Sequence, residues 1–256
     1  MADHVQSLAR GLAVIRAFSA TEPELTLSQV ARATGLSRAA ARRFLLTLTD
    51  LGYVRGDGRL FALTPRVLEL GYAYLSSLSL PEVADPHLER LAAEVRESAS
   101  VAVLDGEDVV YVARVATARI MRVTISIGTR FPAYCTSMGR VLLAGLRPQE
   151  LEAYLERAEL RRLTSRTLVL PAALRAELDQ VRDMGWAMVD QELEEGLRSI
   201  AAPIRDRSGR TVAAVNVSTH ATRTSMQAAR RDLLPPLLAT AEKIEADLAS
   251  VSVTRA

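Results

Sequence analysis

The residues of this sequence that could do chemistry begin with a basic stretch near the N-terminus. No acidic residue occurs between Glu24 and Asp50, whereas four arginines fall there, namely Arg32, Arg38, Arg42 and Arg43. Arginine donates hydrogen bonds to phosphate oxygens and to guanine edges, so a local basic stretch is typical of a nucleic-acid-binding surface. The net charge of the chain is only +2, so the sequence predicts a polyanionic partner at one place.

The elements that must position these arginines are three helices and a hairpin. Apolar spacing predicts helices over residues 7–18, 28–34 and 37–51, the first capped by Ser7 and the third by Ser37. An Asp57-Gly58 pair between two short apolar runs predicts a β-hairpin. The predicted order is that of a winged helix-turn-helix: two helices, a turn containing Gly35, a third helix and a hairpin.

The third predicted helix has two different faces. Ala41, Leu45, Leu48 and Leu51 form an apolar stripe that we expect to pack on the first two helices. Small residues and arginines on the other face, with two arginines beside the hairpin turn, are predicted to contact DNA: Ser37, Arg38, Ala39, Ala40, Arg42, Arg43, Thr47, Arg55 and Arg59. The alternative is a helical subdomain whose arginines are merely solvated, but the absence of nearby acidic residues favours DNA binding.

A second domain is predicted after a hinge. Thr64 and Pro65 predict the start of a helix over residues 65–75, and residues 76–81 resemble a hinge. We therefore predict a DNA-binding domain over 1–64, a linker over 65–80 and a C-terminal domain over 81–256. The apolar residues of the 65–75 helix cover a wide face, which predicts that it pairs with its counterpart in a dimer.

The C-terminal region alternates between strand and helix patterns. Strands are predicted over residues 101–105, 109–115, 121–128, 186–189, 200–205 and 211–218, and helices over 85–98, 137–145, 148–157, 171–184 and 226–249. Neighbouring strands joined by tight turns, with helices between them, indicate an α+β fold with an antiparallel sheet flanked by helices.

Polar residues inside apolar elements of this region could bind a ligand. Asn216 and Ser218 share one face of a strand, where they bond either to neighbouring backbone or to a ligand. The N-terminus of the helix that starts near Ser137, with Gly139 in its first turn, would suit a carboxylate. A carboxylate also favours a cation, and the candidates are Arg119, Arg122, Arg130 and Arg140.

Five stretches of the chain resemble the IclR family of bacterial transcriptional regulators. They are residues 7–12, 27–54, 136–144, 195–203 and 213–218, which follow one another in the order expected of that family. Residues 128–134, with residues 136–140, resemble more particularly the regulators of aromatic-acid catabolism of the PcaR, PcaU and PobR type.

The resemblance implies a GAF-like effector-binding domain, a homodimer or dimer of dimers, and binding to palindromic promoter DNA. It also implies a small carboxylic-acid effector, such as protocatechuate, 4-hydroxybenzoate or β-ketoadipate, or a glyoxylate-like acid if the chain regulates another operon. By the resemblance, the effector site comprises Ser137, Met138, Gly139, Ser199, Asn216 and Ser218, and we add Arg130 because it belongs to the aromatic-acid motif.

Other functions are less well supported. A small-molecule enzyme needs a nucleophile–base or metal constellation; the three histidines show no ligand spacing, and we predict no catalytic residue, metal or cofactor. We expect the acids between Asp190 and Glu195 to be solvated and the single Cys135 to be a buried structural thiol. No apolar run of 18 residues occurs, so we expect a cytoplasmic protein without a membrane partner. An architectural DNA-binding protein without an effector remains a further alternative.

Overall fold

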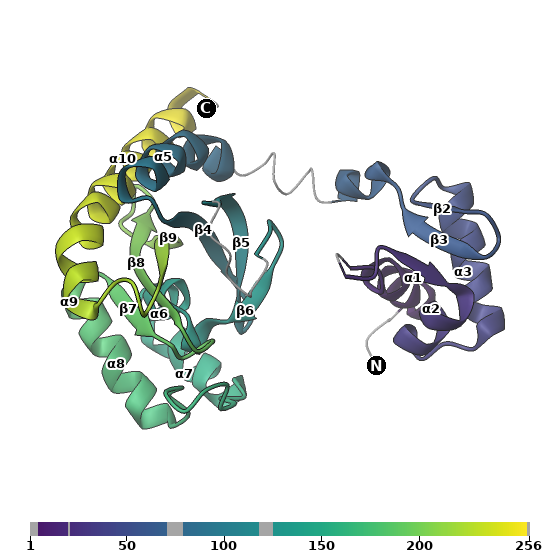
Figure 1. The fold of residues 1–256 in the computed structure, drawn as a ribbon, viewed down its shortest axis with the longest axis horizontal. Helices are drawn as coiled ribbons and strands as arrows, with labels where there is room; N and C mark the ends of the chain where they lie inside the picture. Colours follow the sequence, from purple (N-terminus) through teal and green to yellow (C-terminus); the bar gives the residue numbers. More distant parts are fainter. Residues whose placement is uncertain (1–4, 20, 71–78, 118–124, 255–256) are drawn as a thin grey trace. The chain divides into compact units, whose positions relative to one another are not determined.

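The computed structural model describes residues 5–19, 21–70, 79–117 and 125–254. Its contacts divide the chain into two compact units, Met1–Ser77 and Leu78–Ala256 (Figure 1). None of the helices in the described ranges combines the length and the apolarity that a membrane span requires.

The first unit is a three-helix domain with a small sheet. Its elements are α1 (Gln6–Arg16), β1 (Glu24–Thr26), α2 (Leu27–Thr34), α3 (Arg38–Asp50), β2 (Val54–Gly56), β3 (Leu60–Leu63) and the 3-10 turn η1 (Pro65–Leu68). The three strands pair antiparallel in the order β1-β3-β2. Val14, Val30, Leu45 and Phe61 are among the residues of its apolar core. The predicted order of three helices and a hairpin is confirmed.

Three details of this unit differ from the sequence-based expectations. Strand β1 was not predicted. Helix α2 begins at Leu27 rather than Ser28, because Thr26 caps it and exchanges hydrogen bonds with Gln29 in a capping box. The prediction that Ser7 caps the first helix is wrong, since Val5 occupies that position and supplies no side-chain bond. Leu51 does not belong to the buried stripe, because the helix ends at Asp50 and leaves Leu51 52% exposed.

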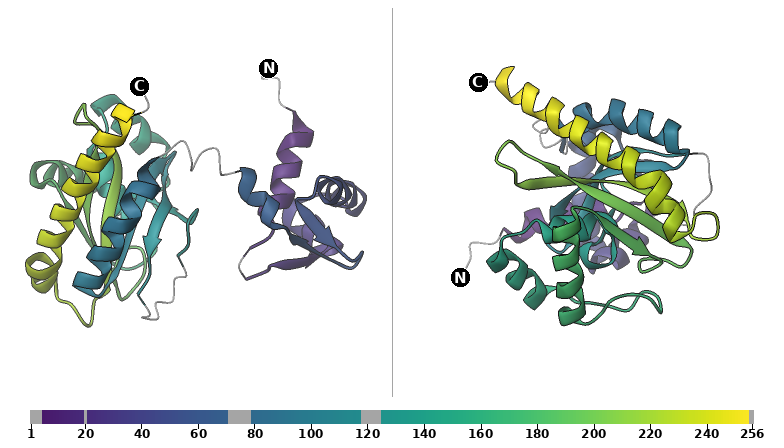
Figure 2. Two further views of the ribbon diagram at one scale, coloured as in Figure 1. Left: turned by 90° about the horizontal axis from the view of Figure 1, so that it is seen from above. Right: turned by 90° about the vertical axis from the view of Figure 1, so that its left-hand side faces the viewer.

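The second unit contains a six-stranded antiparallel sheet with helices on both faces (Figures 1 and 2). The strands are β4 (Ser98–Asp105), β5 (Asp108–Val115), β6 (Arg130–Pro132), β7 (Ala187–Asp190), β8 (Leu197–Arg205) and β9 (Thr211–His220), in the spatial order β6-β5-β4-β9-β8-β7. The helices are α5 (Ser79–Val95), η2 (Ala133–Cys135), α6 (Ser137–Ala144), α7 (Pro148–Arg157), α8 (Pro171–Met184), α9 (Met226–Ala228), η3 (Ala229–Leu233) and α10 (Leu234–Thr254).

The sheet separates two apolar cores. Val215 and Val217 of β9 face the core that includes residues of α5 and α10, whereas Ala214 faces the core that includes residues of α6 and α8. Because side chains alternate along a strand, Asn216 and Ser218 share the face of Ala214 and point towards the α6 layer. The predicted α+β fold with an antiparallel sheet flanked by helices is confirmed.

Two predicted elements fall partly outside the described residues. Of the predicted helix over 65–75, Pro65–Leu68 form a 3-10 turn, and residues 71–75 lie outside the described residues. Of the predicted strand over 121–128, residues 121–124 lie outside the described residues, while 125–128 form a loop and a turn rather than a strand. The next strand begins at Arg130.

Candidate functional sites

Helix α3 presents the predicted cationic face to the outside of its unit. Ala41, Leu45 and Leu48 are buried, which fixes the helix against the core. The residues predicted to contact DNA on this helix are exposed, except for Ala40, which is half-buried: Ser37, Arg38, Ala39, Arg42, Arg43 and Thr47. The exposed face therefore combines small and cationic side chains, which are the residue types that contact phosphates and base edges in a DNA groove.

The arginines of this face are available to bind a partner. Within the described parts of the chain, no ion pair involves Arg38, Arg42 or Arg43. The Ser37 hydroxyl accepts a hydrogen bond from the Ala40 N–H at 3.2 Å, which confirms Ser37 as the cap of the helix. The other N–H groups of the first turn have no intrahelical partner and point towards the helix N-terminus, where a phosphate is favoured.

The β2–β3 hairpin carries the other two predicted DNA contacts. Both Arg55 and Arg59 are exposed, but Arg55 lies 3.5 Å from Glu24 of β1, so its charge is partly neutralised. The Asp57 carboxylate accepts hydrogen bonds from the N–H groups of Arg59 and Leu60, both at 2.8 Å, and these bonds lower the pKa of Asp57. The tip of the hairpin is thus held in shape by its own acidic residue.

A small pocket lies between the sheet and the start of α6 in the second unit. Its lining residues come from β5, β7, β8, β9, η2, α6 and two loops: Tyr111, Ile125, Cys135, Thr136, Ser137, Val189, Leu193, Leu197, Ser199, Asn216 and Ser218. The free space holds about one water molecule. Three predicted effector residues besides Ser137 meet here, namely Ser199, Asn216 and Ser218.

Two polar atoms of this pocket are buried without a hydrogen-bond partner. They are the Ser137 hydroxyl and the Asn216 Oδ1. The Asn216 amide donates to the Ser218 hydroxyl at 3.2 Å, so these two side chains satisfy each other only in part. Buried polar groups are nearly always hydrogen-bonded in proteins, so these two atoms are free to bond a ligand or a water molecule in the pocket.

Arg114 is a cation on the same face of the sheet, and the sequence did not single it out. Ser100 of β4 is directly opposite both Arg114 of β5 and Asn216 of β9, so the three residues form one row. Arg114 donates to the Ser100 hydroxyl at 3.2 Å, and its Nε is buried without an acceptor. Burial lowers the pKa of Arg114. The sequence carries no signal for this role of Arg114, because the role depends on the pairing of β5 with β4, which places Arg114 beside Ser100.

Three predicted effector residues do not line this pocket. Arg130, on strand β6, is held by Asp105 at 2.6 Å and by Asp108 at 3.1 Å, so its charge is already compensated. Met138 is fully buried in the core, and the Gly139 N–H is taken by the Thr136 hydroxyl at 3.1 Å. Gly139 therefore contributes no free N–H group to the N-terminus of this helix, and its lack of a side chain serves close packing against Ala133.

The surroundings of the pocket are apolar and aromatic. The ring of Tyr111 meets Phe131 edge to face, with centroids 5.8 Å apart. Burial raises the pKa of Tyr111 to about 12, so its hydroxyl stays protonated and can donate to an anion. Burial also raises the pKa of Cys135 to about 12, and this thiol is fully buried. Cys135 thus lacks the thiolate character that reactive cysteines need.

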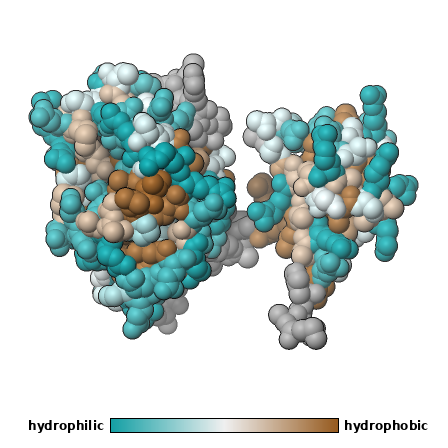
Figure 3. Space-filling view, turned by 90° about the horizontal axis from the view of Figure 1, so that it is seen from below, coloured by the Kyte–Doolittle hydropathy of each residue, from teal (hydrophilic) through white to brown (hydrophobic). Residues whose placement is uncertain are grey.

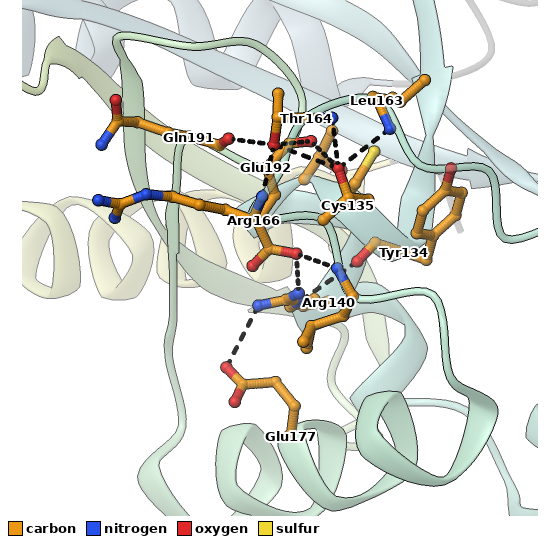
Figure 4. A network of polar contacts seen from close by, with 12 residues as sticks. Tyr134, Cys135, Arg140, Leu163, Thr164, Arg166, Glu177, Gln191 and Glu192 are labelled. Atoms are coloured by element: carbon orange, nitrogen blue, oxygen red, sulfur yellow. Dashed lines mark hydrogen bonds and ion pairs between the residues drawn. The ribbon is translucent and has the colours of Figure 1, made fainter.

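The acids between Asp190 and Glu195 are not a solvated run. Asp190 forms ion pairs with Arg166 and Arg198, and Glu192 forms one with the buried Arg140 at 2.6 Å (Figure 4). The prediction of a solvated run is wrong for these two residues, because the fold brings arginines from distant segments to them. Among the described residues, no group of histidine, cysteine or acidic side chains could hold a metal ion.

Together, an exposed cationic helix in one unit and an incomplete polar pocket in the other define a DNA-binding regulator with a separate effector domain. Family models match both parts: residues 7–58 match the IclR helix-turn-helix domain, and residues 72–246 match the bacterial transcriptional regulator IclR C-terminal model. The chain belongs to the IclR family of bacterial transcriptional regulators.

Individual relatives span nearly the whole chain. The Pca regulon regulatory protein of Pseudomonas putida is 51% identical over 243 residues, which cover 94% of this chain and 84% of that protein. A transcriptional regulator from Rhodococcus sp. RHA1 is similar in structure, with a TM-score of 0.87, 63% identity, and coverage of 97% of this chain and 100% of that one.

A third relative is an IclR homolog from Microbacterium hydrocarbonoxydans, solved in complex with 4-hydroxybenzoate. Its TM-score is 0.84 and its identity 28%, with coverage of 95% of this chain and 99% of that one. These proteins are regulators of transcription, in agreement with the prediction that the chain is not an enzyme.

Proposed function

We propose that this protein binds promoter DNA through α3 and the β2–β3 hairpin, in the cytoplasm, and that a small aromatic carboxylic acid controls this binding from the pocket beneath α6. The Pca regulon regulator and the homolog bound to 4-hydroxybenzoate support an acid of aromatic catabolism. The Tyr111 ring, which lines the pocket and packs edge to face on Phe131, favours an aromatic acid over a small one such as glyoxylate.

The observation that carries the effector proposal is that the buried guanidinium of Arg114 has no ion-pair partner among the described residues. Its Nε has no acceptor, no acid among the described residues pairs with it, and it shares a row with Asn216 of the pocket. A guanidinium binds a carboxylate with two parallel hydrogen bonds, so Arg114 is the proposed carboxylate anchor. The orphan Ser137 hydroxyl is a proposed partner of a ligand hydroxyl or of a second carboxylate, and the orphan Asn216 Oδ1 is a proposed acceptor for a ligand hydroxyl.

The small size of the pocket suggests how binding is coupled to regulation. The free space holds about one water molecule, so an aromatic acid fits only when a lining side chain such as Ile125 moves aside. A ligand that binds only the widened form shifts the population towards it. This difference in affinity between the two forms is what can change the activity of the DNA-binding unit.

Calorimetric titration with 4-hydroxybenzoate, protocatechuate, β-ketoadipate and glyoxylate tests the proposal. We expect the protein to bind an aromatic acid, and Arg114→Gln to raise the Kd by about tenfold to a hundredfold, because a hydrogen bond to a charged group contributes about 1.5–3 kcal/mol. Arg130→Gln is the matched control: Arg130 already pairs with Asp105 and Asp108, so its loss should leave the Kd unchanged. Equal affinities of the wild type and Arg114→Gln would disprove the anchor.

A further inference from the structure

One wall of the pocket is a loop with little regular structure. Leu193 lines the pocket from the loop between β7 and β8, which spans residues 191–196. Gln191 has a φ of 62°, a conformation that L-residues other than asparagine and aspartate rarely adopt. The loop's own hydrogen bonds join Gln191 to Gly196 and Glu194 to Leu197, at its two ends. The hydrogen bonds in its middle, beside Leu193, come from other segments of the chain.

Glu192, the neighbour of Leu193, supplies these contacts. Its carboxylate accepts hydrogen bonds from Arg140 at 2.6 Å and from the Leu168 N–H at 3.1 Å (Figure 4). Its carbonyl oxygen accepts from the Thr167 hydroxyl at 2.7 Å. Glu192 thus ties the loop both to helix α6 and to the segment before α8.

Arg140 lies one helical turn after Ser137, which lines the same pocket. Its side chain is only 2% exposed and also donates to the Tyr134 carbonyl at 3.2 Å and to Glu177 at 3.3 Å. A buried guanidinium without its acidic partners would raise the free energy of the folded protein. Separation of Glu192 from Arg140 is therefore unfavourable. The pocket floor on α6 and the pocket wall at Leu193 are therefore held at a defined separation.

We infer that the Arg140–Glu192 ion pair positions the loop so that Leu193 closes the effector pocket, and that Glu192 sets the affinity for the acid without contacting it. The inference rests on the proposed function of this pocket. Glu192 does not line the pocket and is a positioning residue.

Glu192→Gln in the full-length protein tests this role, because glutamine keeps the size of the side chain and removes its charge. We expect the Kd for 4-hydroxybenzoate to rise by about tenfold, a coupling of the size usual for residues that act at a distance. Peptide-resolved hydrogen exchange should show faster exchange in residues 191–197. Glu177→Gln is the matched control, since Glu177 meets the same guanidinium from α8 but does not touch the loop, and should change neither quantity.

Unchanged affinity and unchanged exchange in Glu192→Gln would overturn the inference, and so would an equal loss in Glu177→Gln. If Glu192→Gln does not fold, Thr164→Val replaces it. This variant leaves the Glu192 carboxylate in place and removes the Thr164 hydroxyl, whose shortest bond is the 2.7 Å bond to the Gln191 carbonyl and which also meets the Glu192 carbonyl and the Arg166 N–H. It should shift both readouts in the same direction by less. If the wild type binds none of the acids tested, the proposed function fails, while the exchange measurement still decides whether Glu192 positions the loop.

Discussion

At the scale of single residues, the arginines without an acidic partner are the ones that can bind an anionic ligand. Arg130 and Arg140 are compensated by acids inside their unit, as is Arg198. Arg42 on α3 and Arg114 on β5 have no acid beside them among the described residues. An uncompensated cation binds an anion from outside without first breaking an internal pair, so Arg42, like Arg38 and Arg43, is a candidate for contacts with DNA, and Arg114 is one for contact with the effector.

Replacing Arg42 with alanine tests the DNA-binding surface. If Arg42 neutralises a phosphate, Arg42→Ala should weaken binding to a promoter fragment and reduce the slope of log K against log salt by about 1. Mobility-shift titrations at several salt concentrations measure both quantities. Arg147→Ala in the second unit is the control, because it removes the same charge from an exposed pair with Glu150. A wild-type salt slope in Arg42→Ala would refute the phosphate contact.

At the scale of elements, close backbone packing decides how α6 is placed. A Cβ on Gly139 would lie 2.0 Å from the carbonyl oxygen of Ala133 in η2, 2.4 Å from its Cα and 2.5 Å from its carbonyl carbon. Only glycine therefore lets α6 lie against η2, and this contact sets the position of Ser137 at the pocket. Gly139 influences the pocket through the placement of α6 and not through its own atoms.

Gly139→Ala should destabilise the second unit by about 1–3 kcal/mol, the usual cost of overpacking, because neither backbone segment can yield without shifting. Thermal or urea unfolding followed by circular dichroism gives this difference. Gly11→Ala is the matched control in α1, where the added Cβ would find its nearest neighbour 3.9 Å away. We expect it to be neutral or stabilising, since alanine favours a helix more than glycine does. Unchanged stability of Gly139→Ala would contradict the packing argument.

At the scale of the whole molecule, apolar surface points to self-association. In the first unit, Leu8 and Leu12 of α1 are 63% and 48% exposed, and Leu68 is 76% exposed. The second unit also presents an apolar area framed by hydrophilic residues (Figure 3). Exposed apolar groups of this kind mark interfaces, so we propose a homodimer or a dimer of dimers.

Light scattering at micromolar concentration should therefore show a dimer or tetramer. The double variant Leu8→Glu and Leu12→Glu should lower the molar mass of the particle in solution, because it places two charges in the proposed interface. Arg10→Glu is the control, since it reverses a charge on another face of the same helix. A wild-type monomer, or a double variant of unchanged mass, would count against this interface.

The sequence by itself determined the elements whose ends carry strong local signals. Helices α7 and α8 begin and end where they were predicted, because a proline sits in the first turn of each and Gly185 adopts the left-handed conformation that ends α8. The exposed arginines of α3 were also predicted, because the helical period alone separates them from Ala41, Leu45 and Leu48.

Only the tertiary structure decided the partners of the charged and polar residues. Local pattern predicted Arg130 as a candidate for the ligand, but the pairing of β5 and β6 places it between two acids, while the pairing of β4 and β5 leaves Arg114 without one. The physical reason is that hydrogen-bond partners and burial depend on segments far apart in the chain. Ser100, Arg114 and Asn216 become neighbours only when three strands align in register.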